Sequence, residues 1–306
     1  MFSPTGPILV TGVPRSGTTW LARLFAAAPG TSLAGREPMN PRGKQYALGG
    51  TLSEWTRLTR PSGRQALLLR TTYAGLNPRT YGRYGRHQTR AMLPGTRMIV
   101  KDPFAMLSVP AIYRLTGARA VLVYRHPGAV LASYRRMGWS ADIAETFRVA
   151  TDHAEEVLPL IGSSAGDLLE RGPDALTDTE AMGLFWTVFS ALATDDVKRT
   201  PGALIVAHPE VAAGGTAAVD RLMTAVGLRA TDAVHAEISA AGAGDAPTPR
   251  GEAPDSGKLH RFDRSPAEVA NSWRKHVDAT DIERLEEIAG PVLATIEAAR
   301  LKVLDG

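Results

Sequence analysis

The sequence predicts an α/β protein with a central parallel sheet flanked by helices. Short apolar segments indicate four buried strands, at residues 7–11, 97–101, 118–124 and 202–207. Helical patterns cover residues 18–28, 128–137, 141–162, 179–199, 216–226 and 278–300. Short apolar runs that alternate with helices are typical of βαβ units, in which helices cover both faces of a parallel sheet. We therefore expect one domain over residues 1–306.

The composition is that of a globular protein and excludes several classes. The chain has 306 residues, is 44% hydrophobic and carries a formal net charge of +4, which is too small to indicate nucleic-acid binding by itself. It has no cysteine, which excludes disulfides, thiol nucleophiles and cysteine-ligated metals. The sequence shows no secretory signal and no apolar run as long as a membrane span. We expect a cytoplasmic protein with no membrane partner.

Two long segments lack periodicity, and one helix carries a clear apolar stripe. Residues 38–95 are rich in Arg, Gly, Pro and Tyr, and residues 240–266 are rich in Gly, Pro and Ala. Long irregular segments in compact domains are usually functional, so we expect these two to act as lids over an acceptor or a cofactor. The stripe predicts plain core packing, and its residues are Met182, Phe185, Trp186, Phe189 and Leu192.

A glycine-containing loop lies between the first predicted strand and the first helix. Its sequence is GVPRSGTTW, residues 12–20. Backbone N–H groups and the helix dipole make such a junction an anion site, which predicts a P-loop-type sheet. The two glycines have the spacing of a Walker A loop, but Thr18 stands where that motif has its essential lysine, and the cation is Arg15 instead. A nucleoside triphosphatase would lack the lysine that reaches its β- and γ-phosphates.

A second motif follows the third strand, with the sequence RHPGAVLAS at residues 125–133. Arg125 stands at the carboxyl end of the strand, and Ser133 lies one to two turns into the next helix. Both can point into the crevice where open α/β sheets bind ligands. A guanidinium fork together with a hydroxyl suits a terminal phosphate.

The two motifs together resemble those of the sulfotransferases that use 3′-phosphoadenosine 5′-phosphosulfate (PAPS), in particular bacterial and carbohydrate members. The resemblance implies that Arg125 and Ser133 hold the 3′-phosphate and that Trp20 stacks on adenine. It assigns the 5′-phosphosulfate to the loop amides together with Arg15, Ser16, Gly17, Thr18 and Thr19. Trp273 and Arg274 resemble a late Trp-Arg element of bacterial members and are candidates for closing over the nucleotide.

The catalytic residues are also implied by this resemblance. Residues 101–104, KDPF, resemble the lysine-bearing strand end of the family, but Pro103 stands where cytosolic eukaryotic members have a histidine. Glu37 is then the candidate base, because several bacterial and glycan sulfotransferases use a glutamate in the corresponding segment. A solvated Glu37 paired with Arg36 is the alternative, and Asp102 is the next carboxylate to test. Positive charge from Arg15 and Lys101 would face the transferring sulfuryl group and the leaving phosphate.

The resemblance implies transfer of a sulfuryl group from PAPS to a hydroxyl of a glycan or small natural product, giving a sulfate ester and PAP. No metal is expected, because the seven histidines are scattered without ligand spacing. Arginines and tyrosines interleave between residues 57 and 97; we expect an acceptor wall or lid there, with a solvated surface or protein contact as the alternative and nucleic acid disfavoured. The sequence leaves a homodimer possible and does not decide the oligomeric state. The rival functions are a small-molecule kinase of P-loop architecture and a non-catalytic nucleotide-binding protein of the same fold.

Overall fold

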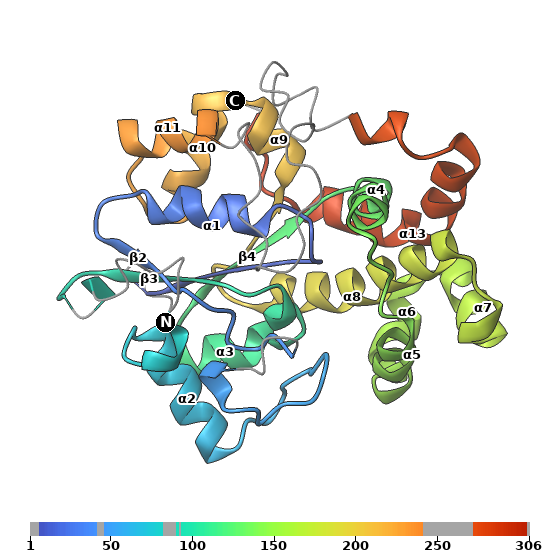
Figure 1. Ribbon diagram of the computed structural model, residues 1–306, viewed down its shortest axis with the longest axis horizontal. Helices are drawn as coiled ribbons and strands as arrows, with labels where there is room; N and C mark the ends of the chain where they lie inside the picture. The colour runs from blue at the N-terminus through green and yellow to red at the C-terminus, as the bar shows by residue number, and fades with distance from the viewer. Residues whose placement is uncertain (1–5, 42–45, 82–89, 92, 241–271, 305–306) are drawn as a thin grey trace.

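The computed structural model describes residues 6–41, 46–81, 90–91, 93–240 and 272–304. Its centre is a five-stranded sheet with the order β2-β3-β1-β4-β5, in which every strand pair is parallel (Figure 1). The strands are β1 (Ile8–Thr11), β2 (Thr31–Leu33), β3 (Arg97–Lys101), β4 (Arg119–Tyr124) and β5 (Leu204–Ala207). The predicted α/β class with a parallel sheet flanked by helices is confirmed.

Helices cover both faces of the sheet. Successive residues of each strand point to opposite faces, and because both sets are apolar, both faces must be buried. Ile8 and Val10 belong to one apolar cluster and Leu9 to the other. Figure 1 shows α1 (Thr18–Ala26), α10 (Gly215–Ala225) and α11 (Asp232–Ala240) on one side of the sheet. On the other side lie α2 (Gly63–Tyr73), α3 (Val109–Thr116) and α8 (Asp178–Arg199). Strands buried on both faces read as continuous apolar runs, which is why the sequence shows them.

The remaining described α-helices are α4 (Pro127–Met137), α5 (Ile143–Asp152), α6 (Ala154–Ile161), α7 (Ser163–Arg171), α9 (His208–Ala213) and α13 (Ala279–Ala299). Of these, α9 packs against α10 after β5, and the other five pack around α8. The predicted apolar stripe of α8 is fully buried, as core packing requires. Trp186 of this stripe also donates a hydrogen bond from Nε1 to the Arg125 carbonyl oxygen (3.1 Å), which fixes the turn after β4.

Some sequence predictions of secondary structure are wrong. The helix expected over residues 141–162 is divided into α5 and α6 at His153. The segment 38–95 is not irregular throughout, because α2 lies inside it and begins with a capping box between Ser62 and Gln65. The segment 240–266 begins at the last residue of α11 and otherwise lies outside the described residues.

Candidate functional site

The loop between β1 and α1 forms a candidate anion site at the carboxyl edge of the sheet. Arg15 has a left-handed backbone with φ of 73°, and Gly17, the N-cap of α1, has φ of 96°. Within the described residues, no side chain caps α1 and its first turn has no acidic residue. The N–H groups of that turn and the helix dipole therefore favour a bound anion. The Ser16 hydroxyl is buried without a hydrogen-bond partner in the described part of the chain, an arrangement that a ligand oxygen would satisfy.

Residues from the two sequence motifs meet beside this loop. Arg15 donates a hydrogen bond from Nε to the Ser133 hydroxyl oxygen at 3.0 Å, although the two residues are 118 positions apart. Arg125 donates from Nη1 to the Arg15 carbonyl oxygen at 3.4 Å. Two guanidinium groups and a hydroxyl thus lie together at the ends of β1 and β4. The structure brings these three predicted site residues into one place.

His208, the first residue of α9, closes the loop from the side of β5. A Cβ atom added to Gly17 would lie 2.0 Å from the His208 ring carbon Cδ2, so the glycine is required for this contact. Burial, with the nearby positive charge of Arg125, lowers the pKa of the His208 imidazole to about 3. The ring is therefore neutral near pH 7. The Trp20 ring meets it edge-on, with ring centroids 5.1 Å apart, and packs partly against the core. Adenine stacking by Trp20 stays a prediction.

Lys101 and Glu37 form an ion pair at the carboxyl end of β3, the strand next to β1. The second oxygen of the Glu37 carboxylate accepts a hydrogen bond from the Asn40 side-chain amide. The side chains of Lys101 and Glu37 are 23% and 19% exposed, so the pair is shielded yet reachable. Glu37 is therefore not the solvated side chain of the alternative, and Lys101 is one of its partners. A carboxylate and an ammonium group therefore flank the anion site.

Trp273 and Arg274 lie beside the turn after β4, in a packing arrangement. The Trp273 ring stacks on the His126 ring with centroids 4.7 Å apart and an interplanar angle of 18°. It is 6% exposed and lies over Gly128, where an added Cβ would be 2.3 Å from the indole. The Arg274 guanidinium lies 4.7 Å from the Trp273 ring centre. The indole supports the first turn of α4; nucleotide contact by either residue stays a prediction.

The acceptor wall expected between residues 57 and 97 stays a prediction, and only part of the segment is exposed. Arg60, Arg64, Arg70, Arg79 and Arg90 are exposed, which fits an acceptor wall and a solvated surface equally. Tyr73 is 2% exposed and belongs to the core, so its assignment to the wall is wrong. Arg57 bonds the Asp196 carboxylate at 2.5 Å and holds the fold together. Arg83, Arg86 and Tyr84 lie outside the described residues.

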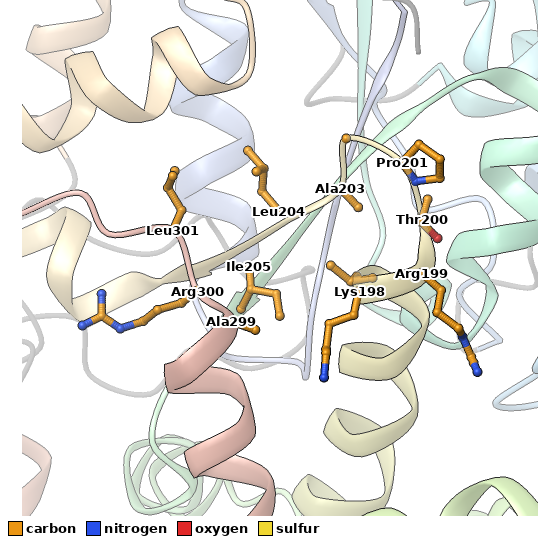
Figure 2. Close-up of a pocket in the computed structure, with 12 residues that line it drawn as sticks. Lys198, Arg199, Thr200, Pro201, Ala203, Leu204, Ile205, Ala299, Arg300 and Leu301 are labelled. Carbon is orange, nitrogen blue, oxygen red and sulfur yellow. The ribbon is translucent and has the colours of Figure 1, made fainter. Parts of the chain in front are cut away.

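A cavity of about 660 Å³ lies away from these residues, at the amino end of β5. Residues 197–205 and 299–301 line it, and Figure 2 shows Arg199 and Arg300 pointing to opposite sides. Both arginines are paired with acids, Arg199 with Asp195 and Arg300 with Glu297, each at 2.6 Å. In the described ranges, no cluster of His, Asp and Glu could hold a metal ion. No helix in the same ranges has the length and hydropathy to cross a bilayer.

Fold and site together define an α/β protein of P-loop type with a positively charged anion site. The sequence model of the sulfotransferase family matches residues 7–159, half of the chain, and the protein belongs to this family. Sulfuryl transfer is the chemistry of that family. A search of curated proteins finds no match.

Two sulfotransferases are among the solved structures similar to this chain. The sulfotransferase domain of the olefin synthase of Synechococcus PCC 7002 is 18% identical, with 92% of this chain and 94% of that one covered and a TM-score of 0.45. The sulfotransferase STF1 of Mycobacterium tuberculosis is 16% identical, with 78% and 72% covered and a TM-score of 0.42.

The sequence did not predict two neighbours of the site, His208 and Trp139, nor the backbone contact that holds Asp102. His208 contacts Gly17, and Trp139, 39% exposed, has its ring centre 5.9 Å from the Arg15 guanidinium. Asp102 is fully buried and bonds the backbone of Met39. Each contact joins segments distant in the chain, so no local pattern encodes it.

The buried His208 predicts a loss of stability in acid. The unfolded chain binds a proton at this residue below about pH 6.5, but the folded chain excludes it down to about pH 3. The free energy of unfolding therefore falls as pH decreases through this window, by at most about 1.4 kcal/mol per pH unit. Urea unfolding from pH 7 to pH 4 should show a shallower fall for His208→Gln than for the wild type. The same substitution at the exposed His276, His276→Gln, is the control and should leave the slope as in the wild type. Equal slopes for wild type and His208→Gln would contradict a buried, neutral His208.

Proposed function

We propose that this protein transfers a sulfuryl group from PAPS to a hydroxyl of a glycan or small natural product, giving a sulfate ester and PAP. The observation that carries the proposal is the convergence of Arg15, Arg125 and Ser133. Two guanidinium forks beside one hydroxyl suit a ligand with two separate anionic groups. PAPS and PAP carry such groups at the 3′ and 5′ positions of one nucleoside. The Lys101–Glu37 pair at the neighbouring strand end supports a transfer reaction rather than binding alone.

The donor-binding roles divide between the two motifs. Arg125 and Ser133 hold the 3′-phosphate at the start of α4. The first-turn amides of α1 and the buried Ser16 hydroxyl hold the 5′ group, because they form the anion site described above. The loop residues that share this role are Arg15, Gly17, Thr18 and Thr19. Trp20 offers its ring face to adenine, and Trp273 with Arg274 borders the same turn.

Bound PAPS supplies a sulfuryl group attached to a phosphate leaving group. Glu37 takes the proton of the acceptor hydroxyl on a carboxylate oxygen. Lys101 and Arg15 provide positive charge that is fixed before the reaction, where negative charge develops during it. Because Glu37 and Lys101 are in contact, proton removal and charge neutralisation occur at one place.

PAP binding without a metal tests the donor assignment. PAP at 100 times its dissociation constant should raise the free energy of unfolding by about 2.7 kcal/mol, in the presence of EDTA as in its absence. Arg125→Ala should weaken PAP binding at least about tenfold and AMP binding far less, because a lost hydrogen bond to a charged group costs roughly 1.5–3 kcal/mol. Thermal shift and calorimetric titration measure both effects.

Arg229→Ala is the matched control for the change in charge. Arg229 is exposed and follows Val226 and Gly227, whose carbonyl oxygens accept hydrogen bonds from Arg97 at the amino end of β3, opposite the site. PAP affinity should be unchanged in this variant. Stabilisation by ATP with Mg²⁺ but not by PAP would contradict the proposal and favour the rival function, a small-molecule kinase. Equal losses of PAP and AMP in Arg125→Ala would remove Arg125 from the 3′ position.

Glu37→Gln tests the base. General-base catalysis contributes about 10²–10⁴-fold, so kcat should fall by about that factor while PAP affinity stays the same. The assay is release of PAP from PAPS with a hydroxyl acceptor found by screening. Glu170→Gln, an exposed change on α7, should have no effect. A rise confined to the acceptor KM would make Glu37 a binding residue, and unchanged turnover would exclude it from the site.

A further inference from the structure

Asp102 is a buried carboxyl group that the proposed reaction does not use. It follows β3 directly and is 0% exposed. Its Oδ1 accepts the Phe104 N–H at 3.0 Å and so caps the 3₁₀ turn Pro103–Ser108. Its Oδ2 accepts the Met39 N–H at 2.5 Å, across 63 residues of chain. Both carboxylate oxygens are therefore engaged with backbone, and neither is open to an acceptor hydroxyl.

The backbone of Asp102 is fixed as firmly as its side chain. Its N–H donates to the Val10 carbonyl oxygen at 3.0 Å, and its own carbonyl accepts from the Thr11 hydroxyl at 2.8 Å. Both partners belong to β1, the central strand before the anion loop. The carboxyl group is consequently held in place relative to that loop, and so is the backbone N–H of Met39 that it binds.

Met39 lies two residues after Glu37, whose carboxylate pairs with Lys101, the residue before Asp102. The Met39 side chain is 1% exposed and is anchored in the core. Position 39 is thus tied to the end of β3 by the hydrogen bond from its N–H to the Asp102 carboxylate and by burial. This tie sets the position of the turn that carries Glu37 relative to Lys101.

The groups that face Asp102 explain why its ionised carboxylate costs folding free energy. Glu37 and Lys101 act on it electrostatically, and the buried Tyr73 of α2 lies close by. Burial and the negative charge of Glu37 raise the pKa of the Asp102 carboxyl to about 8, against the two N–H bonds and Lys101. Capping alone does not require a residue with this cost, because a serine caps a turn about equally well.

We propose that Asp102 is a positioning residue for the transfer reaction, which places Glu37 beside Lys101 by binding the Met39 N–H. The inference rests on the proposed function, since it assigns Asp102 an effect through Glu37. It predicts that Asp102 matters only when Glu37 is present as a base.

Two variants separate the cap from the tie to Met39. Asp102→Ser keeps a hydroxyl that caps the Phe104 N–H but is too short to reach Met39 as well. Asp102→Asn keeps the size but places an NH₂ donor against one of the two N–H groups. Each should lower kcat by about 10–100-fold and leave PAP affinity within about twofold. Ser62→Ala, which removes the capping box of α2, is the control for a lost cap and should leave kcat unchanged. If Asp102→Asn does not fold, Asp102→Ser alone carries the test.

A double-mutant cycle with Glu37→Gln decides the inference. Asp102→Ser should have little further effect on kcat in the Glu37→Gln background, because the base it positions is already absent. Hydrogen exchange of the Met39 amide should be faster in Asp102→Ser, which reports the tie without any turnover. An equal kcat loss in both backgrounds would overturn the inference, as would an unchanged kcat in Asp102→Ser while Glu37→Gln is impaired. That last result leaves the proposed function intact. An unimpaired Glu37→Gln would overturn the assigned base, and this inference with it.

Discussion

The parallel pairing of β1 with β3 on one side and β4 on the other is the constraint on which the site depends. Val10 is in register with Lys101, and Thr11 with Leu122, so β3 and β1 end within one residue of each other and β4 runs two residues further. The loop after β1 therefore leaves the sheet between the lysine of β3 and the arginine after β4. Gly12 allows it to do so, because a Cβ at that position would lie 2.1 Å from the Val123 carbonyl oxygen of β4. A shift in register would separate the cations that the anion site needs.

The charges at this edge follow from what is buried there. Arg15, Arg125 and Lys101 contribute three positive charges, and Glu37 one negative charge. His208 is neutral because its pKa is low, and burial with the charge of Glu37 raises the pKa of Asp102, but the sum of these charges is positive even when Asp102 is ionised. The edge therefore stays positive in total and favours a ligand with more than one negative group. The two buried groups have opposite effects on stability: the cost of His208 grows in acid, and that of Asp102 grows as pH rises from about 4 to 8.

The sequence predicts those parts of the fold that a local pattern encodes. Strands β1, β3, β4 and β5 are apolar runs bounded by turns, and helix α8 repeats its apolar residues every three to four positions. Strand β2 has only the three residues 31–33, too few for a pattern, and α2 exposes Leu67 at 61%, which breaks its amphipathic signal. In the site, the loop and the Arg125 motif could be found because residue type and spacing reflect phosphate chemistry. The His208–Gly17 and Asp102–Met39 contacts could not, because they join segments that meet only in the folded chain.

Phosphorus NMR of bound PAP tests the central claim most directly, because it observes the 3′- and 5′-phosphates separately. With the wild-type protein and EDTA, both resonances should shift from their positions in free PAP. With Ser133→Ala, the 3′ resonance should move back toward its free position while the 5′ resonance remains shifted, since the loop amides are unchanged. Resonances that stay at their free positions with the wild-type protein, or that respond equally to Ser133→Ala, would contradict the account.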